Sequence, residues 1–166
     1  YLSYLLTPAT VCLAIPLYLQ LDLLKKNILA ILGGVFSGVL ASLGSVLAMS
    51  VLFGLDHAEY VTMLPKSITT AIGMGVSEEL GGYVTISVAV IIITGVLGNM
   101  LAEVVYKIAK IEEPIARGLG LGTSAHAIGT AKAMELGPVE GAMSSLAIAV
   151  AGLLTVVGAS VFAGMM

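Results

Sequence analysis

The sequence predicts an all-α, multi-pass membrane protein, and both its composition and its apolar runs indicate this class. Of the 166 residues, 58% are hydrophobic and 10% are charged, whereas soluble domains contain about 45–50% apolar and about 25% charged residues. Too few charges remain to cover a surface that faces water. The apolar runs are continuous, whereas the strands of a transmembrane barrel alternate in polarity. We therefore expect helices that lie in a lipid bilayer, the cell (inner) membrane.

Charge and cysteine content exclude several functional classes. The net charge is −3, and the basic residues are scattered, whereas binding to nucleic acid needs a clustered basic face. A lone cysteine, Cys12, can form neither an internal disulfide nor a cysteine metal cage. No Ser-His-Asp arrangement and no metal-ligand spacing is present. We therefore expect neither an enzyme nor a protein that holds a metal or cofactor.

Four long uncharged runs are expected to cross the bilayer. About 20 residues at about 1.5 Å per residue cover its ~30 Å hydrocarbon core. The chain begins at Tyr1 rather than at Met, so we also expect an N-terminal part to be missing. In chain order, the expected spans lie near residues 1–21, 28–54, 84–106 and 141–166.

Two shorter segments, residues 65–80 and 118–136, are interrupted by glycine and resemble each other. They align at a constant shift that pairs Gly73 with Gly129 and Thr70 with His126. Apolar stretches of this kind are often re-entrant rather than spanning. Paired, interrupted segments in corresponding halves of a chain also indicate the binding site of a transporter.

The distribution of Lys and Arg favours the re-entrant version. If Lys25 and Lys26 are cytoplasmic, a re-entrant segment 65–80 also brings Lys107 and Lys110 to the cytoplasm, as the positive-inside rule requires. The two short segments then enter from opposite sides of the membrane, as an inverted repeat does in carriers with alternating access. Two broken helices that cross the bilayer completely remain the alternative.

Broken helices would create a binding site for an anion. The first N–H groups of a helix lack partners and carry a partial positive charge, and two such ends at mid-membrane would attract a small organic anion. Hydroxyl groups could add donors, and glycines would let a ligand approach the backbone. The alternative is that small and hydroxyl residues pack helices together. The candidate binding residues of this kind are Thr69, Thr70, Gly73, Ser124, Gly129 and Thr130.

Three ionisable residues complete the predicted site. His126 lies in an apolar segment, where it could carry a coupling proton or pair with an anion; the alternative is a neutral imidazole bonded to a neighbouring helix. Lys66 and Lys132 flank the short segments and could contact an anion, or extend to the membrane surface. Separately, Gly34 and Gly38 form a GxxxG motif, which predicts a close helix contact within the chain or with a second subunit.

Three stretches of this sequence resemble the LrgB/CidB family of bacterial membrane proteins. They are Thr7–Tyr18 (TPATVCLAIPLY), Leu64–Thr70 (LPKSITT) and Ala116–Ala131 (ARGLGLGTSAHAIGTA). The resemblance covers essentially the whole chain, as one LrgB-like domain over 1–166. It implies a multi-pass protein that works with a small membrane protein of the LrgA/CidA type, and we also expect a homo-oligomer.

Two functions follow as hypotheses from different classes. The first is a transporter of small monocarboxylates, with proton coupling as a further option; the resemblance implies substrates of the pyruvate or glycolate class. The second, also implied by the resemblance, is an antiholin-like regulator of murein hydrolase activity and autolysis. The transporter needs the polar residues of the short segments, whereas the regulator needs helix interfaces for assembly.

Overall fold

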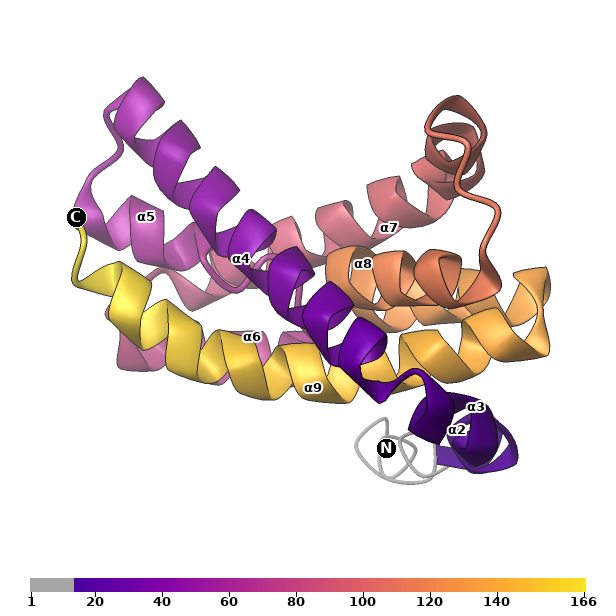
Figure 1. The fold of residues 1–166 in the computed structure, drawn as a ribbon. Helices are drawn as coiled ribbons and strands as arrows, with labels where there is room; N and C mark the ends of the chain where they lie inside the picture. The colour runs from indigo at the N-terminus through magenta and orange to yellow at the C-terminus, as the bar shows by residue number, and fades with distance from the viewer. Residues whose placement is uncertain (1–13) are drawn as a thin grey trace, which may run out of the picture.

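The computed structural model describes residues 14–166, and every regular element in that part of the chain is a helix. The all-α fold class is therefore confirmed. The helices in chain order (Figure 1) are α2 (Ala14–Leu19), α3 (Leu21–Lys26), α4 (Ile28–Phe53), α5 (His57–Met63), α6 (Thr70–Glu79), α7 (Val84–Ile108), α8 (Pro114–Leu136) and α9 (Pro138–Ala163).

Three helices, α4, α7 and α9, are long and apolar enough to cross a membrane. Large hydrophobic side chains point outward from all three, such as Leu52 (74% exposed), Ile108 (78%) and Leu153 (73%). Lipid tails stabilise such a surface, whereas water does not. The predicted spans that coincide with these helices are 28–54, 84–106 and 141–166.

The predicted span near 1–21 lies mostly outside the described residues. From Ala14 onward the chain forms the short helices α2 and α3, with Gln20 between them. Asn27 follows α3, and its side chain donates a hydrogen bond to the Leu23 carbonyl (3.0 Å). The described part of this region is therefore two short helices rather than one long helix.

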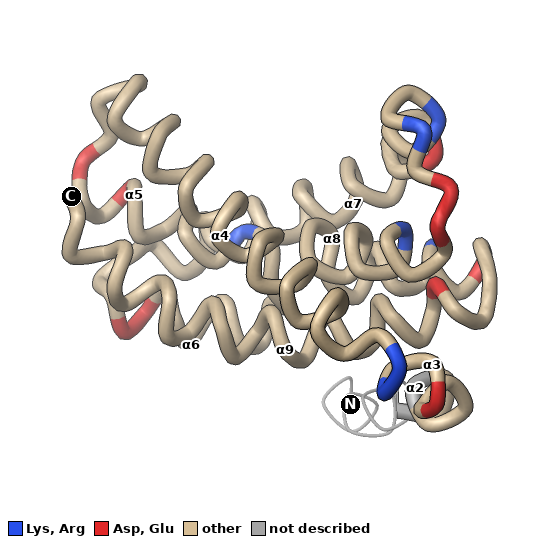
Figure 2. Tube along the Cα trace, in the orientation of Figure 1, with Lys and Arg blue, Asp and Glu red and all other residues tan. Residues whose placement is uncertain are grey.

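The charged residues divide between the two ends of the long helices (Figure 2). One end, which we call the acidic end, joins the start of α5 to the end of α9 through a hydrogen bond from the Tyr60 hydroxyl to the Phe162 carbonyl (2.9 Å). The opposite end, which we call the mixed-charge end, contains the start of α4, the end of α7 and the start of α9. The acidic residues at the acidic end are Asp56, Glu59, Glu78 and Glu79, whereas every Lys and Arg except Lys66 lies toward the mixed-charge end.

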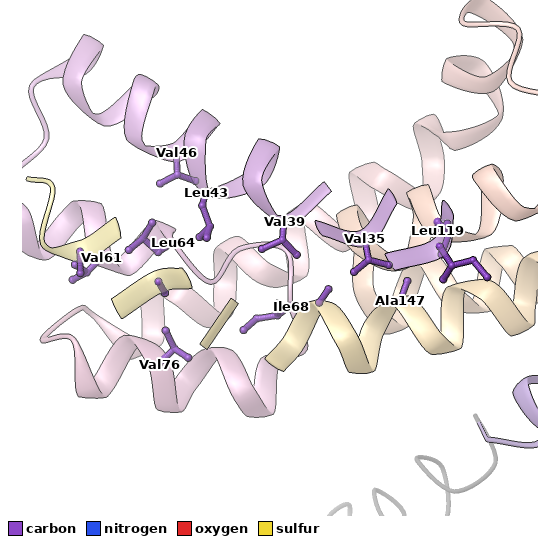
Figure 3. Close-up of a cluster of buried hydrophobic side chains, with 14 of the residues drawn as sticks. Val35, Val39, Leu43, Val46, Val61, Leu64, Ile68, Val76, Leu119 and Ala147 are labelled. Atoms are coloured by element: carbon purple, nitrogen blue, oxygen red, sulfur yellow. The ribbon is translucent and has the colours of Figure 1, made fainter. Parts of the chain in front are cut away.

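One face of α4 forms much of the core (Figure 3). Val35, Val39, Leu43 and Val46 recur at helical spacing on this face and are at most 5% exposed. Their cluster includes residues of α8 and α9 and of the segment that joins α5 to α6. Because this face of α4 is buried, the position of α4 depends on how the other helices pack against it. The other labelled members of the cluster are Val61, Leu64, Ile68, Val76, Leu119 and Ala147.

Glycines allow α8 to approach both of its long neighbours. A Cβ atom at Gly122 would lie 2.5 Å from the Ser144 carbonyl oxygen of α9. A Cβ atom at Gly38 of α4 would lie 3.0 Å from Thr123 Oγ1 of α8, and one at Gly34 would lie 3.1 Å from a Leu119 methyl group. The predicted close contact at the GxxxG motif is therefore made within the chain, with α8.

Replacing Gly122 by Ala should destabilise the protein. The added methyl group would meet the α9 backbone, and overpacking of this kind costs about 1–3 kcal/mol. The matched control is Gly44→Ala on α4, where a Cβ atom meets nothing within 4 Å; it should be neutral or slightly stabilising, because Ala favours helix more than Gly does. Thermal unfolding in detergent measures both, and equal midpoints for the two variants would contradict this account of the α8–α9 contact.

Candidate functional site

Two helical hairpins occupy the space between the long helices. The first hairpin comprises α5, residues 64–69 and α6. Its first leg begins at the acidic end, where an Asp56 capping box starts α5. Its tip reaches the middle of α4, where Ser42 Oγ donates to Ser67 Oγ (2.9 Å). Its second leg returns to the start of α7, where Ser87 Oγ donates to Ser77 Oγ (2.7 Å).

The second hairpin is α8, whose helix is broken at His126. This residue has φ 44° and ψ −135°, which are not helical values. The chain reverses there, because a Cβ atom at Gly129 would lie only 2.6 Å from the Leu121 carbonyl oxygen, whereas eight residues of straight helix span about 12 Å. Both legs reach Tyr106 at the mixed-charge end: its hydroxyl donates to the Arg117 carbonyl (2.7 Å), and Leu136 packs in its cluster.

Both hairpins contact the same residue, Ile91, in the middle of α7. The Ile91 side chain contacts the backbone at Gly73 of the first hairpin, where an added Cβ would collide with it. The Ile91 carbonyl accepts a hydrogen bond from His126 Nε2 of the second hairpin (2.9 Å). Ile91 is itself fully buried. The residues next to each helix break therefore meet at one level of α7.

From Ile91 the two second legs run along α7 in opposite directions. In the second hairpin, Asn99 Nδ2 donates to the Ile128 carbonyl (3.2 Å), and farther along Lys132 pairs with Glu103 (2.6 Å). These contacts move toward the C-terminus of α7. In the first hairpin, the contact of Gly73 with Ile91 is followed by that of Ser77 with Ser87, toward the N-terminus of α7.

The residues at the tip of the second hairpin are held by a chain of hydrogen bonds. His126 is 3% exposed, and its ring occupies space beside Gly95, where a Cβ atom would lie 2.7 Å from Cε1. Thr130 Oγ1 donates to the His126 carbonyl (3.0 Å) and lies 2.7 Å from Ser144 Oγ. The imidazole and the carbonyl of His126 therefore each have a hydrogen-bond partner within the protein, as an apolar environment requires.

The other predicted residues of the second hairpin are placed differently. The Ser124 side chain is exposed, and its hydroxyl donates to the Gly120 carbonyl of its own helix (2.6 Å). Lys132 lies toward the mixed-charge end, where it pairs with Glu103 and with Glu135 (3.3 Å). Gly129 serves the close approach of the two legs. These residues share one hairpin, but Ser124 and Lys132 do not face the His126–Ile91 contact.

The predicted residues of the first hairpin gather at its tip. Thr69 precedes α6 in an extended conformation and makes no side-chain cap, and the half-buried Thr70 begins the helix. Gly73 is buried against α7. Lys66 is half-buried, and its Nζ atom donates to Ser42 Oγ and to Ser67 Oγ, both at 3.1 Å.

Sequence reasoning left out four residues that the structure adds to this region. Ser42 lies on the same face of α4 as the GxxxG motif, and Ser67 aligns with Thr123 in the two similar segments, so both had a detectable signal. Ile91 and Ser144 had none, because their roles arise only from the packing of α7 and α9 against the hairpin tips.

Two cavities lie away from the hairpin tips. One, of about 390 Å³, is at the mixed-charge end and is lined by Glu103, Tyr106 and Lys107 among others. The other, of about 670 Å³, is a groove between α4 and α8 beside Gly34 and Gly38. Neither is lined by the predicted anion-binding residues. Within residues 14–166, no three His, Cys, Asp or Glu side chains lie close enough together to hold a metal ion.

We expect His126 and Gly95 to be energetically coupled. Gly95→Ala should destabilise the protein, because the new methyl group meets the His126 ring. His126→Ala should also destabilise it, by about 1–3 kcal/mol, through loss of a buried hydrogen bond and of packing. In the double variant the two methyl groups fit together, so the loss should be smaller than the sum of the single losses. A strictly additive result in a thermal double-mutant cycle would contradict the contact.

Comparison with known proteins places the chain in a family. The profile of the LrgB-like family matches residues 1–165. The chain is 42% identical over 156 residues to the antiholin-like protein LrgB of Bacillus mycoides strain KBAB4 and to those of Bacillus cereus strains B4264 and AH187; each match covers 94% of this chain and 68% of the relative. No solved structure matches. The resemblance and the membrane localisation inferred from the sequence are thereby confirmed, and the chain belongs to the LrgB-like family.

Proposed function

We propose that this protein is a membrane carrier for small monocarboxylates, of the pyruvate or glycolate class, that works by alternating access. The observation that carries the proposal is the meeting of two hairpins at Ile91, one from each end of α7. If α7 crosses the bilayer, the two hairpins are re-entrant from opposite sides and form an inverted repeat. Carriers of this architecture bind substrate near the bilayer midplane, between broken helices.

The polarity at the centre supports an anionic substrate. The helix α6 and the second leg of α8 both begin near Ile91 and point away from each other. Helix N-termini carry a partial positive charge, so the two starts favour negative charge between them. Thr69, Thr70 and Gly73 belong to the first start, and His126, Gly129 and Thr130 to the second.

Transport can be measured directly. Liposomes that contain the purified protein should take up labelled pyruvate or glycolate, whereas liposomes without protein, the control, should not. Repeating the measurement with an imposed pH gradient tests whether uptake is coupled to protons. We expect uptake to saturate and to be inhibited by unlabelled carboxylates. If folded protein moves none of a panel of small carboxylates, alone or with an LrgA/CidA-type partner, the carrier proposal is wrong.

The topology provides a second test. In a Cys12→Ser background, Glu79→Cys and Glu135→Cys place one thiol after each second leg, at aligned positions of the two similar segments. An impermeant thiol reagent added to intact cells should label position 79 and spare position 135, because Lys and Arg gather toward the end that contains 135. Labelling of both positions from the same side would rule out the inverted arrangement.

The names of the relatives favour a second candidate function, an antiholin-like regulator of murein hydrolase activity and autolysis. In this reading the protein assembles with an LrgA/CidA-type membrane protein or with copies of itself. The groove between α4 and α8 is a surface where such a helix could pack. A substitution that abolishes carboxylate uptake but leaves autolysis and assembly unchanged would separate this function from transport.

A further inference from the structure

We propose that Lys66, Ser42 and Ser67 form the subsite that binds the substrate's carboxylate, with one net positive charge that selects monoanions. This inference rests on the proposed carrier function and names the residues that recognise the anion. It is carried by three distances: Lys66 Nζ lies 3.1 Å from Ser42 Oγ and 3.1 Å from Ser67 Oγ, and the two hydroxyl oxygens are 2.9 Å apart.

The location of Lys66 is unusual for a lysine of this chain. Every other Lys or Arg lies toward the mixed-charge end, whereas Ser42 holds Lys66 near the middle of α4, at the tip of the first hairpin. Pro65 and Ser67 on either side of it are buried. The Lys66 side chain is therefore at the depth of the bilayer centre if α4 spans it. An ammonium group at that depth is costly and defaults to a functional role.

No carboxylate of the described residues compensates this charge. The ion pairs in that part of the chain are those of Lys132 with Glu103 and Glu135. Among residues 14–166, the hydrogen-bond partners of Lys66 Nζ are two hydroxyl groups, and the acidic residues of the first hairpin lie at its start and end rather than at its tip. A half-buried ammonium group whose partners here are hydroxyl groups favours an anion as its third partner.

The donors that remain match a carboxylate. An ammonium group has three N–H donors, and two of those of Lys66 are used by the serines. The Ser42 hydroxyl donates to Ser67, whereas the Ser67 hydroxyl proton has no acceptor in these contacts. One N–H group and one O–H group therefore have no acceptor within residues 14–166, and a carboxylate can accept one bond on each oxygen.

The charge count determines which anions fit. One monoanion neutralises Lys66, so the occupied hairpin tip carries no net charge and can move past apolar neighbours. A second carboxylate at this depth would lack a cationic partner, so its burial is unfavourable. A neutral amide analogue would lack the charge that compensates the ammonium. We therefore expect monocarboxylates to bind better than both dicarboxylates and amides.

The test compares ligand-induced thermal stabilisation with uptake kinetics for the full chain. Pyruvate should raise the midpoint of thermal unfolding of the wild-type protein in detergent, whereas pyruvamide and malonate should not. Lys66→Met should abolish this shift and raise the KM for uptake by about 100-fold or more, as loss of a buried charge partner does. Lys66→Arg should retain part of the thermal shift and show a smaller rise in KM, because it keeps the charge. The matched control is Lys107→Met, which removes an exposed cation at the end of α7 and should retain both.

Ser67→Ala keeps the charge and removes the free hydroxyl donor, so it tests the subsite even if Lys66→Met does not fold. We expect its KM to rise about 10-fold, as the loss of one hydrogen bond to a charged group does. The unfolding midpoint without ligand should fall as well, because Ser42 and Lys66 lose a shared acceptor. A wild-type KM in Ser67→Ala, or in folded Lys66→Met, would overturn this inference while leaving the carrier function intact. Failure of the wild-type protein to bind or move any carboxylate would instead overturn both.

Discussion

The hydrogen bond from His126 to the Ile91 carbonyl holds the break in α8 at the centre of the protein. A membrane offers no water to satisfy backbone groups that a broken helix frees, so a break is stable only where protein surrounds it. Thr130 and Ser144 complete this environment on the side of α9. Without this bond, the nearest hydrogen bond between the second hairpin and α7 among the described residues would be that of Asn99 to the Ile128 carbonyl, farther along the second leg.

Small residues make this burial possible. Gly95 of α7 leaves room for the His126 ring, and Gly118 and Gly122 of α8 let its backbone approach that of α9. Lipid tails are as apolar as leucine, so helix association in a membrane depends on close packing rather than on the hydrophobic effect. Gly73 and Gly129, the glycines predicted to let a ligand approach the backbone, lie against Ile91 and against the Leu121 carbonyl.

The two hairpins differ in a way that matters for function. At the tip of the second hairpin, His126 Nε2, the His126 carbonyl and the Thr130 hydroxyl each have a protein partner. The tip of the first hairpin carries an ammonium group that has hydroxyl partners only. Such an asymmetry suits a carrier in which one hairpin provides a stable wall and the other responds to the ligand. It does not follow from an assembly role alone, although the family name favours one.

Composition and uncharged runs were sufficient to predict the helical membrane class and the three long helices, because the bilayer sets both the length and the polarity of a spanning segment. The similarity of residues 67–81 and 123–137 also indicated two interrupted segments. The pattern could not reveal which polar groups are already satisfied, since His126 and Lys66 were both candidate binding residues in the sequence. Only packing decided that, because it brought Ile91 to the imidazole and two serines, but no carboxylate, to the ammonium.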